Sequence, residues 1–207
     1  MASSVPTTPA MTHNPDAPSP ESRTEYSYEA FGRDFFETAV TTDRIQAALA
    51  SLTGNAIDFG PRNVGPAGLA SIKAKGEIRE PSVSSVEGDL IQFSVVIPIY
   101  LELTVRLAAH DHRFRADLRA KLSLTARAKR PLHVFIDIPA PSEKDVEVKI
   151  EAQGLRASVL DGVADVDGEL RRFVARYIAK EIEKPNIRSM RDIDVRRALE
   201  KNWEDTA

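Results

Sequence analysis

The chain has 207 residues, which suits one domain with a tail rather than two full domains. Its net charge of -3, from 28 basic and 31 acidic residues, disfavours polyanion binding over the whole surface, and no nucleic-acid partner is expected. The absence of cysteine excludes disulfides and thiol chemistry, and a content of 42% hydrophobic but only 6% aromatic residues predicts an aliphatic core.

The first 26 residues are rich in proline, serine and threonine, and they lack the basic and apolar regions of a secretory signal. They bury too little apolar surface to offset the entropy of ordering, so we expect a disordered tail over 1–26. The longest apolar stretch, SVVIPIYL, is far shorter than the ~20 residues that span a bilayer. We therefore expect a cytoplasmic protein.

A helical pattern begins at Phe31 and continues to Leu52, with apolar residues at three- and four-residue spacings. Gly54 follows, where a helix commonly ends on a residue of positive φ. The segment 57–70 is rich in glycine and proline, which predicts a loop or an irregular sheet edge. Residues 69–78 alternate in polarity and predict a first strand.

The clearest pattern is strict alternation in two consecutive segments. Every odd-numbered residue from Ile91 to Ala109 is apolar, as is every even-numbered residue from Phe114 to Ala128. A helix would scatter the second set around its axis, whereas a strand places all of it on one face. The segments predict a long antiparallel hairpin with arms of about 18–20 residues, which must coil. Pro98 lies in mid-arm and predicts a bulge or bend.

Two further alternating segments, 132–138 and 145–153, complete a predicted sheet of roughly four or five strands. Helical spacing returns over 155–182 and ends before Pro185. Its glycines leave open a kinked helix or a loop followed by a helix capped at Asp167. A last amphipathic stretch, which includes Ile193 and Trp203, predicts a short terminal helix.

The predicted fold class is α+β, because an apolar sheet face of this size requires a cover of helices. We expect a long, highly curved antiparallel sheet wrapped around one or two amphipathic helices. Residues 27–185 would form this domain, and 186–207 would form a C-terminal extension with a short helix.

The concave side of such a sheet predicts an elongated apolar space that suits an acyl chain better than a polar metabolite. Alanines on the inner face of the second arm, at 116, 120, 126 and 128, either admit a closely packed helix or leave a groove. The apolar residues expected to line the space are Phe93, Val95, Ile97, Ile99, Leu101, Leu103, Phe114, Leu118, Leu122, Leu124, Val134, Ile136, Phe173 and Tyr177.

The outer face of the second arm carries a basic stripe. Its members considered for contact with a membrane or partner are Arg113, Arg115, Arg119 and Lys121. One interpretation is a solvated face on which charge protects the sheet, and the other is a footprint for anionic lipid headgroups. No aromatic residues alternate with the stripe, so base stacking is not indicated.

Polar clusters give weaker signals. His110 and His112 flank Asp111 at the hairpin turn, but three ligands without a fourth are weak evidence for a metal. His133 and Asp137 share a strand face without a nucleophile beside them. No phosphate-binding, hydrolase or metalloprotease motif occurs, so no catalytic residue, metal or cofactor is expected.

This layout resembles the tubular lipid-binding (TULIP) superfamily, which includes SMP, BPI-like and mycobacterial phospholipid-binding-type domains. The segments that carry the resemblance are 31–53, 89–109, 112–129 and 155–183. In those domains a highly curved antiparallel sheet wraps a long helix around a lipid-binding channel. The resemblance implies noncatalytic binding or transfer of a lipid or hydrophobic small molecule, and a homodimer formed through exposed sheet edges.

Two other function classes stay open at this point. The first is a protein-interaction module with a fully packed core, which would use its sheet edges or its basic strand face for a partner. The second is a hydrolase or cyclase on a helix-grip or hotdog fold. The second class needs polar groups that project into a cavity, whereas the inward positions here are almost uniformly apolar.

Overall fold

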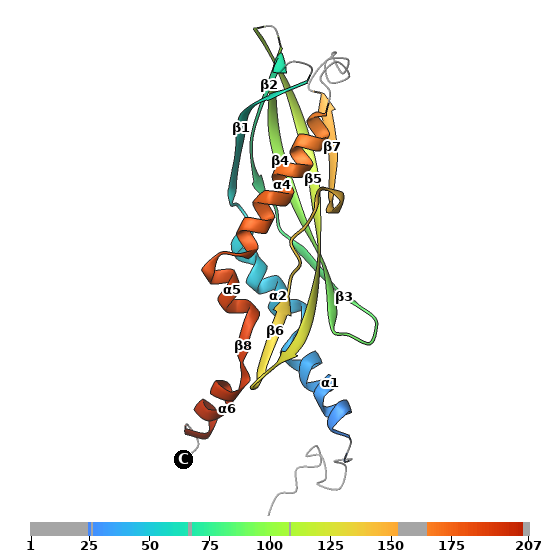
Figure 1. Cartoon of the computed structure of the whole chain (residues 1–207), viewed down its shortest axis with the longest axis vertical. Coiled ribbons are helices and arrows are strands. Elements are labelled where there is room, and N and C mark those ends of the chain that lie inside the picture. Colours follow the sequence, from blue (N-terminus) through green and yellow to red (C-terminus); the bar gives the residue numbers. More distant parts are fainter. Residues whose placement is uncertain (1–24, 26, 66–67, 108, 153–164, 205–207) are drawn as a thin grey trace, which may run out of the picture.

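In the computed structural model, the described residues are 25, 27–65, 68–107, 109–152 and 165–204. They form one eight-stranded antiparallel sheet with helices packed against it (Figure 1). The sheet is strongly curled, so the predicted α+β class with a curved antiparallel sheet is confirmed. The predicted disordered tail lies outside the described residues, apart from Glu25.

Two long strands form the centre of the sheet, β4 (Gln92–Leu107) and β5 (His110–Lys129). They pair in one continuous register over the whole length of β4. Odd-numbered residues of β4 from 93 to 105 and even-numbered residues of β5 from 114 to 126 are buried. The predicted hairpin with one dry face is therefore confirmed.

The bulge expected at Pro98 is absent from the β4–β5 pair, whose register does not shift. The carbonyl of Pro98 accepts the N–H of Arg79 at 2.8 Å, just beyond the end of β2 (Ala70–Ile78). A residue of an antiparallel strand directs its N–H and its C=O to the same neighbour. An N–H at position 98 would therefore point to the segment between β2 and β3 (Ser82–Val86). No strand pairs with β4 at this point, so the missing N–H of proline breaks no ladder hydrogen bond.

The β4–β5 hairpin has different neighbours along its length, and these divide the sheet into two halves. In the upper half of Figure 1 the order is β1-β2-β4-β5-β7, and in the lower half it is β3-β4-β5-β6-β8. The remaining strands are β1 (Ala56–Val64), β6 (His133–Asp137), β7 (Val146–Ala152) and β8 (Asp192–Asp194).

The sheet holds more strands than the sequence predicted. The segment around 57–70 is an irregular edge rather than a loop, because β1 pairs with β2 and shifts register between Phe59 and Arg62. Two short strands, β3 and β8, were not predicted; most of their residues are exposed, so they carry no strong alternation. A 3-10 turn at Glu143–Asp145 occupies the predicted connection before β7.

The segment with the first predicted helical pattern forms two helices, α1 (Tyr28–Ala39) and α2 (Thr42–Leu49), followed by a 3-10 turn. The break lies at Val40, which is extended, and at Thr41, whose hydroxyl accepts the N–H of Arg44 at 3.3 Å. This N-cap starts a new helix in a new direction. Gly54 has the expected positive φ, of 79°.

Among the described residues after β7, helices form at α4 (Val166–Ile182), α5 (Pro185–Arg191) and α6 (Val195–Glu204). The expected cap at Asp167 is wrong, because Asp165 precedes the helix and Asp167 lies in its first turn. Pro185 opens α5, where its missing N–H costs nothing. The possible kink at Gly162 and the side chain of Trp203 lie outside the described residues.

Helices cover the two halves of the concave face unequally. In the upper half, α4 buries Leu170 and Val174 completely, and Ile178 is 2% exposed. In the lower half, α1 buries none of its residues, and α2 and α5 bury one each, Ile45 and Ile187. The alanines of β5 were expected either to admit a closely packed helix or to leave a groove, and both occur. Ala116 and Ala120 are buried in the common core, whereas Ala128 is exposed.

Candidate functional site

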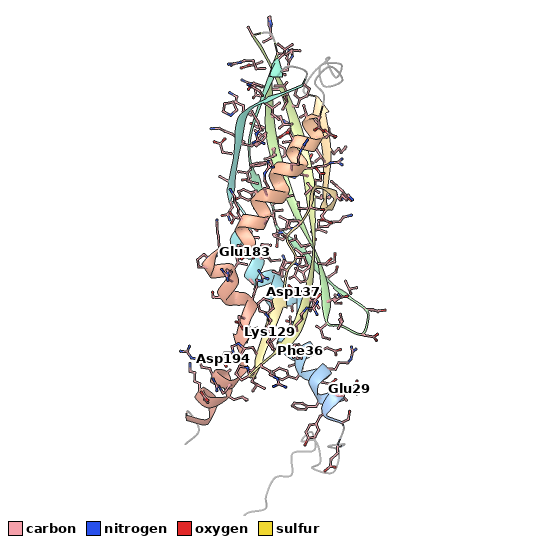
Figure 2. All side chains as sticks on the ribbon, viewed as in Figure 1. Glu29, Phe36, Lys129, Asp137, Glu183 and Asp194 are labelled. Carbon is pink, nitrogen blue, oxygen red and sulfur yellow. The ribbon has the colours of Figure 1, made fainter. Side chains whose placement is uncertain are left out.

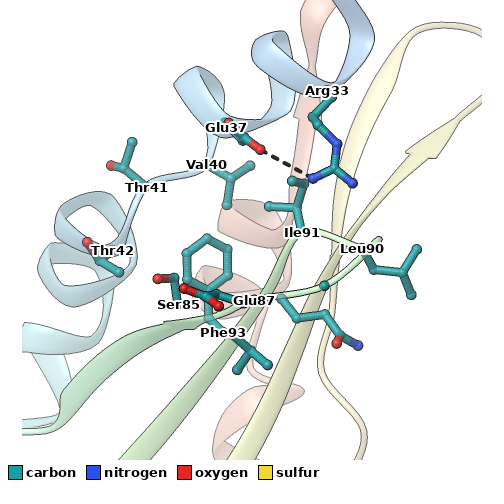
Figure 3. A pocket seen from close by; sticks show the side chains of 13 residues that line it. Arg33, Glu37, Val40, Thr41, Thr42, Ser85, Glu87, Leu90, Ile91 and Phe93 are labelled. Carbon is teal, nitrogen blue, oxygen red and sulfur yellow. Dashed lines mark hydrogen bonds and ion pairs between the residues drawn. The ribbon is translucent and has the colours of Figure 1, made fainter. Parts of the chain in front are cut away.

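The largest described opening of the lower half is a pocket of about 550 Å³ between the α1–α2 joint and the β3–β4 hairpin (Figure 3). We call it the hairpin pocket. Its lining is mixed: Val40, Leu90, Ile91 and Phe93 are apolar, and polar side chains come from α1, the joint and the end of β3. Phe93 is the residue of this lining that the sequence had predicted.

A second opening, the strand-end pocket, has a volume of about 180 Å³ and lies between α1 and the ends of β4 and β5. Gly32 and Phe36 of α1 face Ala126 and Ala128 of β5 across it. Phe36 is half-buried against the core (Figure 2). The small alanine side chains leave the space open, and the pocket shares Leu90 and Ile91 with the hairpin pocket.

The third opening, the helix pocket, has a volume of about 120 Å³ and lies between α2, α5, β5 and β6. Aliphatic side chains dominate its lining, including Leu124 and Ile136 from the predicted set. Two arginines also border it, but backbone carbonyls bind both. Arg191 donates to the carbonyl of Ile136 at 2.9 Å, and Arg44 donates to that of Ala39 at 2.8 Å. The space is therefore suited to an apolar group.

The other predicted lining residues lie in the packed core. Val95, Ile97, Ile99, Leu101, Leu103, Phe114, Leu118, Leu122 and Val134 are all buried. Phe173 and Tyr177 are half-buried on α4, and the Phe173 ring lies 4.5 Å from that of Phe59. Burial raises the pKa of the Tyr177 hydroxyl. Where these residues lie, side chains of the same chain fill the predicted tube.

The basic stripe lies on the convex face and lines none of these three pockets. Arg113 borders a separate opening of about 350 Å³, together with Lys73, Lys75 and Glu102. Arg113, Arg115, Arg119 and Lys121 are exposed, but carboxylates accompany them. Lys121 Nζ lies 2.6 Å from Glu147 Oε1, and this hydrogen bond lowers the pKa of Glu147. Arg115 pairs across strands with Glu102 on one side and Glu151 on the other. The face is thus of mixed charge rather than uniformly cationic.

Residues of the histidine and aspartate clusters make paired polar contacts with neighbouring strands. His133 Nδ1 lies 2.7 Å from Asp192 Oδ1, a contact that joins β6 to β8. Asp137 accepts from Arg127 at 3.2 Å. Asp111 accepts from Arg106, and this hydrogen bond lowers the pKa of the Asp111 carboxyl. Within the described ranges, no group of three potential metal ligands comes together.

Sequence reasoning missed the helical and hairpin residues of these pockets. Phe36 and Ala48 belong to a recognised helical pattern, but that pattern does not indicate which part of the sheet its apolar side covers. Glu37 and Glu87 carry no local signal of a binding role. The pockets form only where segments distant in sequence meet.

The fold and its pockets define a class: an α+β protein whose curled antiparallel sheet holds helices and apolar pockets on its concave side. A curled antiparallel sheet with helices on its concave side is the architecture predicted from the sequence, and that prediction is confirmed. No helix within the described ranges is both long enough and apolar enough to cross a bilayer.

No protein-family model and no curated protein matches the chain. Among solved structures, the chain is similar to the crystal structure of lipopolysaccharide binding protein, with a TM-score of 0.35 and 13% sequence identity. The match covers 78% of this chain and 39% of that one, so this chain spans well under half of that protein's length.

Proposed function

We propose that this protein binds an elongated hydrophobic ligand, such as a lipid, without converting it chemically. The unequal cover of the sheet is the observation that carries the proposal. Aliphatic side chains of α4 seal the upper half. The lower half is covered by α1, which buries none of its residues, and by α2 and α5, which bury only Ile45 and Ile187. Three pockets border this loosely held cover.

The chemistry of the lower half favours an alkyl chain over a polar metabolite. The strand-end and helix pockets present mainly aliphatic and aromatic side chains, and the cations at the helix pocket are already bound to carbonyls. An apolar ligand gains from leaving water, while a polar ligand would lose hydrogen bonds there without replacement. The hairpin pocket, of about 550 Å³, lies within the usual range for small-molecule sites.

Extraction and titration test the proposal together. Mass spectrometry of an organic extract of the purified protein should reveal a bound amphiphile, and the delipidated protein should bind a fluorescent fatty acid. Ala48 lines the helix pocket, so Ala48→Trp should fill it and weaken binding of the probe about tenfold or more, or ~1.4 kcal/mol.

Ala47→Trp is the matched control, because Ala47 is exposed on the same helix and is not part of the lining. It should leave the affinity for the probe unchanged. An empty extract together with no binding of the probe would overturn the proposal. Equal effects of the two tryptophans would remove the helix pocket from the site.

The convex face is expected to play no part in ligand uptake. Neutralising part of the stripe with Arg115→Gln, Arg119→Gln and Lys121→Gln should change the affinity for the fatty-acid probe by no more than about twofold, because these three residues line none of the described pockets. Titration of the variant checks this. A loss of probe binding in a variant with an unchanged melting temperature would place the site on the convex face instead. Contact with an anionic membrane, a homodimer and a cytoplasmic location stay predictions.

A further inference from the structure

The hairpin pocket differs from the two other pockets in its polar side. Arg33, Glu37, Thr41, Ser85 and Glu87 line it together with the apolar residues of early β4. It adjoins the strand-end pocket, because Arg33, Leu90 and Ile91 line both. A ligand with its chain under α1 would therefore reach the hairpin pocket with its polar end.

Arg33 is the one cationic side chain of the described lining, and it already binds two other groups. Arg33 Nη1 lies 3.4 Å from Glu37 Oε1 (Figure 3). Its Nη2 donates to the carbonyl of Asp89 at 2.9 Å. The carboxylate of Glu87 has no ion-pair or hydrogen-bond partner among the described residues. The pocket thus holds two carboxylates against one committed guanidinium, and its uncompensated charge is negative.

The described lining offers no free cation to an anionic head, although neutral donors remain. The amide nitrogen of Gln92 donates one of its two N–H groups to Thr125 Oγ1 at 3.2 Å. The hydroxyl of Thr41 accepts the N–H of Arg44. A phosphate, sulfate or carboxylate placed here would meet Glu87 and Glu37 with no uncommitted cation, so repulsion would disfavour it.

An aromatic ring completes the arrangement. Phe93 and Glu87 both line the pocket (Figure 3), and Ser85 pairs with Phe93 across β3 and β4. Phe93 is 5% exposed, so a small part of its surface faces the pocket. The face of an aromatic ring attracts a cation, and a carboxylate next to it adds ionic attraction. Together, Phe93 and Glu87 fit an ammonium group.

We propose that the hairpin pocket selects the ammonium head of an amphiphile whose alkyl chain lies in the adjoining apolar pockets. The inference rests on the proposed function, since the chain of the ligand would be held in the pockets described there. It adds a preference for head charge that apolar pockets alone do not supply. Because Glu87 is exposed, added salt should weaken this preference.

The test compares amphiphiles with the same chain and different heads. Dodecylamine, dodecyl glucoside and dodecanoate, each below its micellar concentration, would displace the fluorescent fatty acid from the delipidated protein. Dodecylamine should compete at about tenfold lower concentration than dodecanoate, with the glucoside between them. Glu87→Gln should shrink the difference to about twofold or less, with an unchanged melting temperature.

Glu102→Gln is the matched control, because Glu102 lies on β4 but outside the pocket lining, and it should leave the preference intact. Equal or stronger competition by dodecanoate in the wild-type protein would overturn the proposed selection. A preference that survives Glu87→Gln would overturn its assignment to this pocket. Failure of all three compounds to compete would instead contradict the proposed function itself.

Discussion

Leu170→Ala is expected to lower the free energy of unfolding by about 2–5 kcal/mol. Leu170 is 0% exposed and belongs to the face of α4 that fills the concave side of the upper half. Its truncation loses apolar burial and leaves a cavity that neighbouring side chains fill only in part. For a chain of this size the melting temperature should fall by roughly 4–20 °C. Chemical denaturation and a thermal melt followed by circular dichroism check the result.

Leu199→Ala is the control for this prediction. Leu199 lies on α6 and is 50% exposed, so its truncation should change stability by less than about 0.5 kcal/mol. Similar melting temperatures for the two variants would mean that α4 does not pack on the sheet as tightly as its burial indicates. The upper half would then no longer be the closed part of the molecule.

Ala120→Phe is expected to destabilise the protein by about 1–3 kcal/mol, whereas Ala128→Phe is expected to be nearly neutral. Both alanines lie on the inner face of β5. Ala120 is 0% exposed in the packed half, so a ring there must displace its neighbours. Ala128 is exposed and borders the strand-end pocket, so the same ring enters free space. Denaturant titration of both variants measures the difference.

The same two variants separate packing from ligand binding. Ala128→Phe should weaken binding of the fatty-acid probe, because the ring occupies part of the strand-end pocket. Equal stabilities of the two variants would contradict the division of the concave face into a closed and an open half. Unchanged probe affinity in Ala128→Phe would exclude the strand-end pocket from the site.

The open half depends on a local feature of the chain. The backbone is extended at Val40, which ends α1, and Thr41 caps the start of α2. The two helices therefore do not form one continuous helix along the sheet. The hydrogen bond from Arg33 to the carbonyl of Asp89 fastens α1 to the loop before β4. A helix held in this way, with no buried residue of its own, leaves space beneath it.

The central hairpin was predictable because a strand with one buried face alternates between apolar and polar residues. One face of β4 and β5 is buried along nearly their whole length, so every second residue had to be apolar. The same reasoning found β2, β6 and β7. It missed β3 and β8, since short strands with mostly exposed residues show no alternation of polarity.

The candidate site was predictable only in part, and its helical side was not. Phe93, Leu124 and Ile136 were expected at an apolar space and do line pockets. Their neighbours on the same strands, such as Val95 and Leu122, have the same apolar character but lie in the packed core. Nothing in the local pattern of β4 or β5 distinguishes the two groups.

The sequence by itself determined which residues form the long hairpin and which side of it is dry, because alternation of polarity is a local property of an extended chain. Only the tertiary structure decided where that dry side is filled and where it stays open. That outcome depends on the helix that reaches each part of the sheet. At Ala120 the packing is closed and at Ala128 a pocket remains, although both are alanines on the same face of one strand.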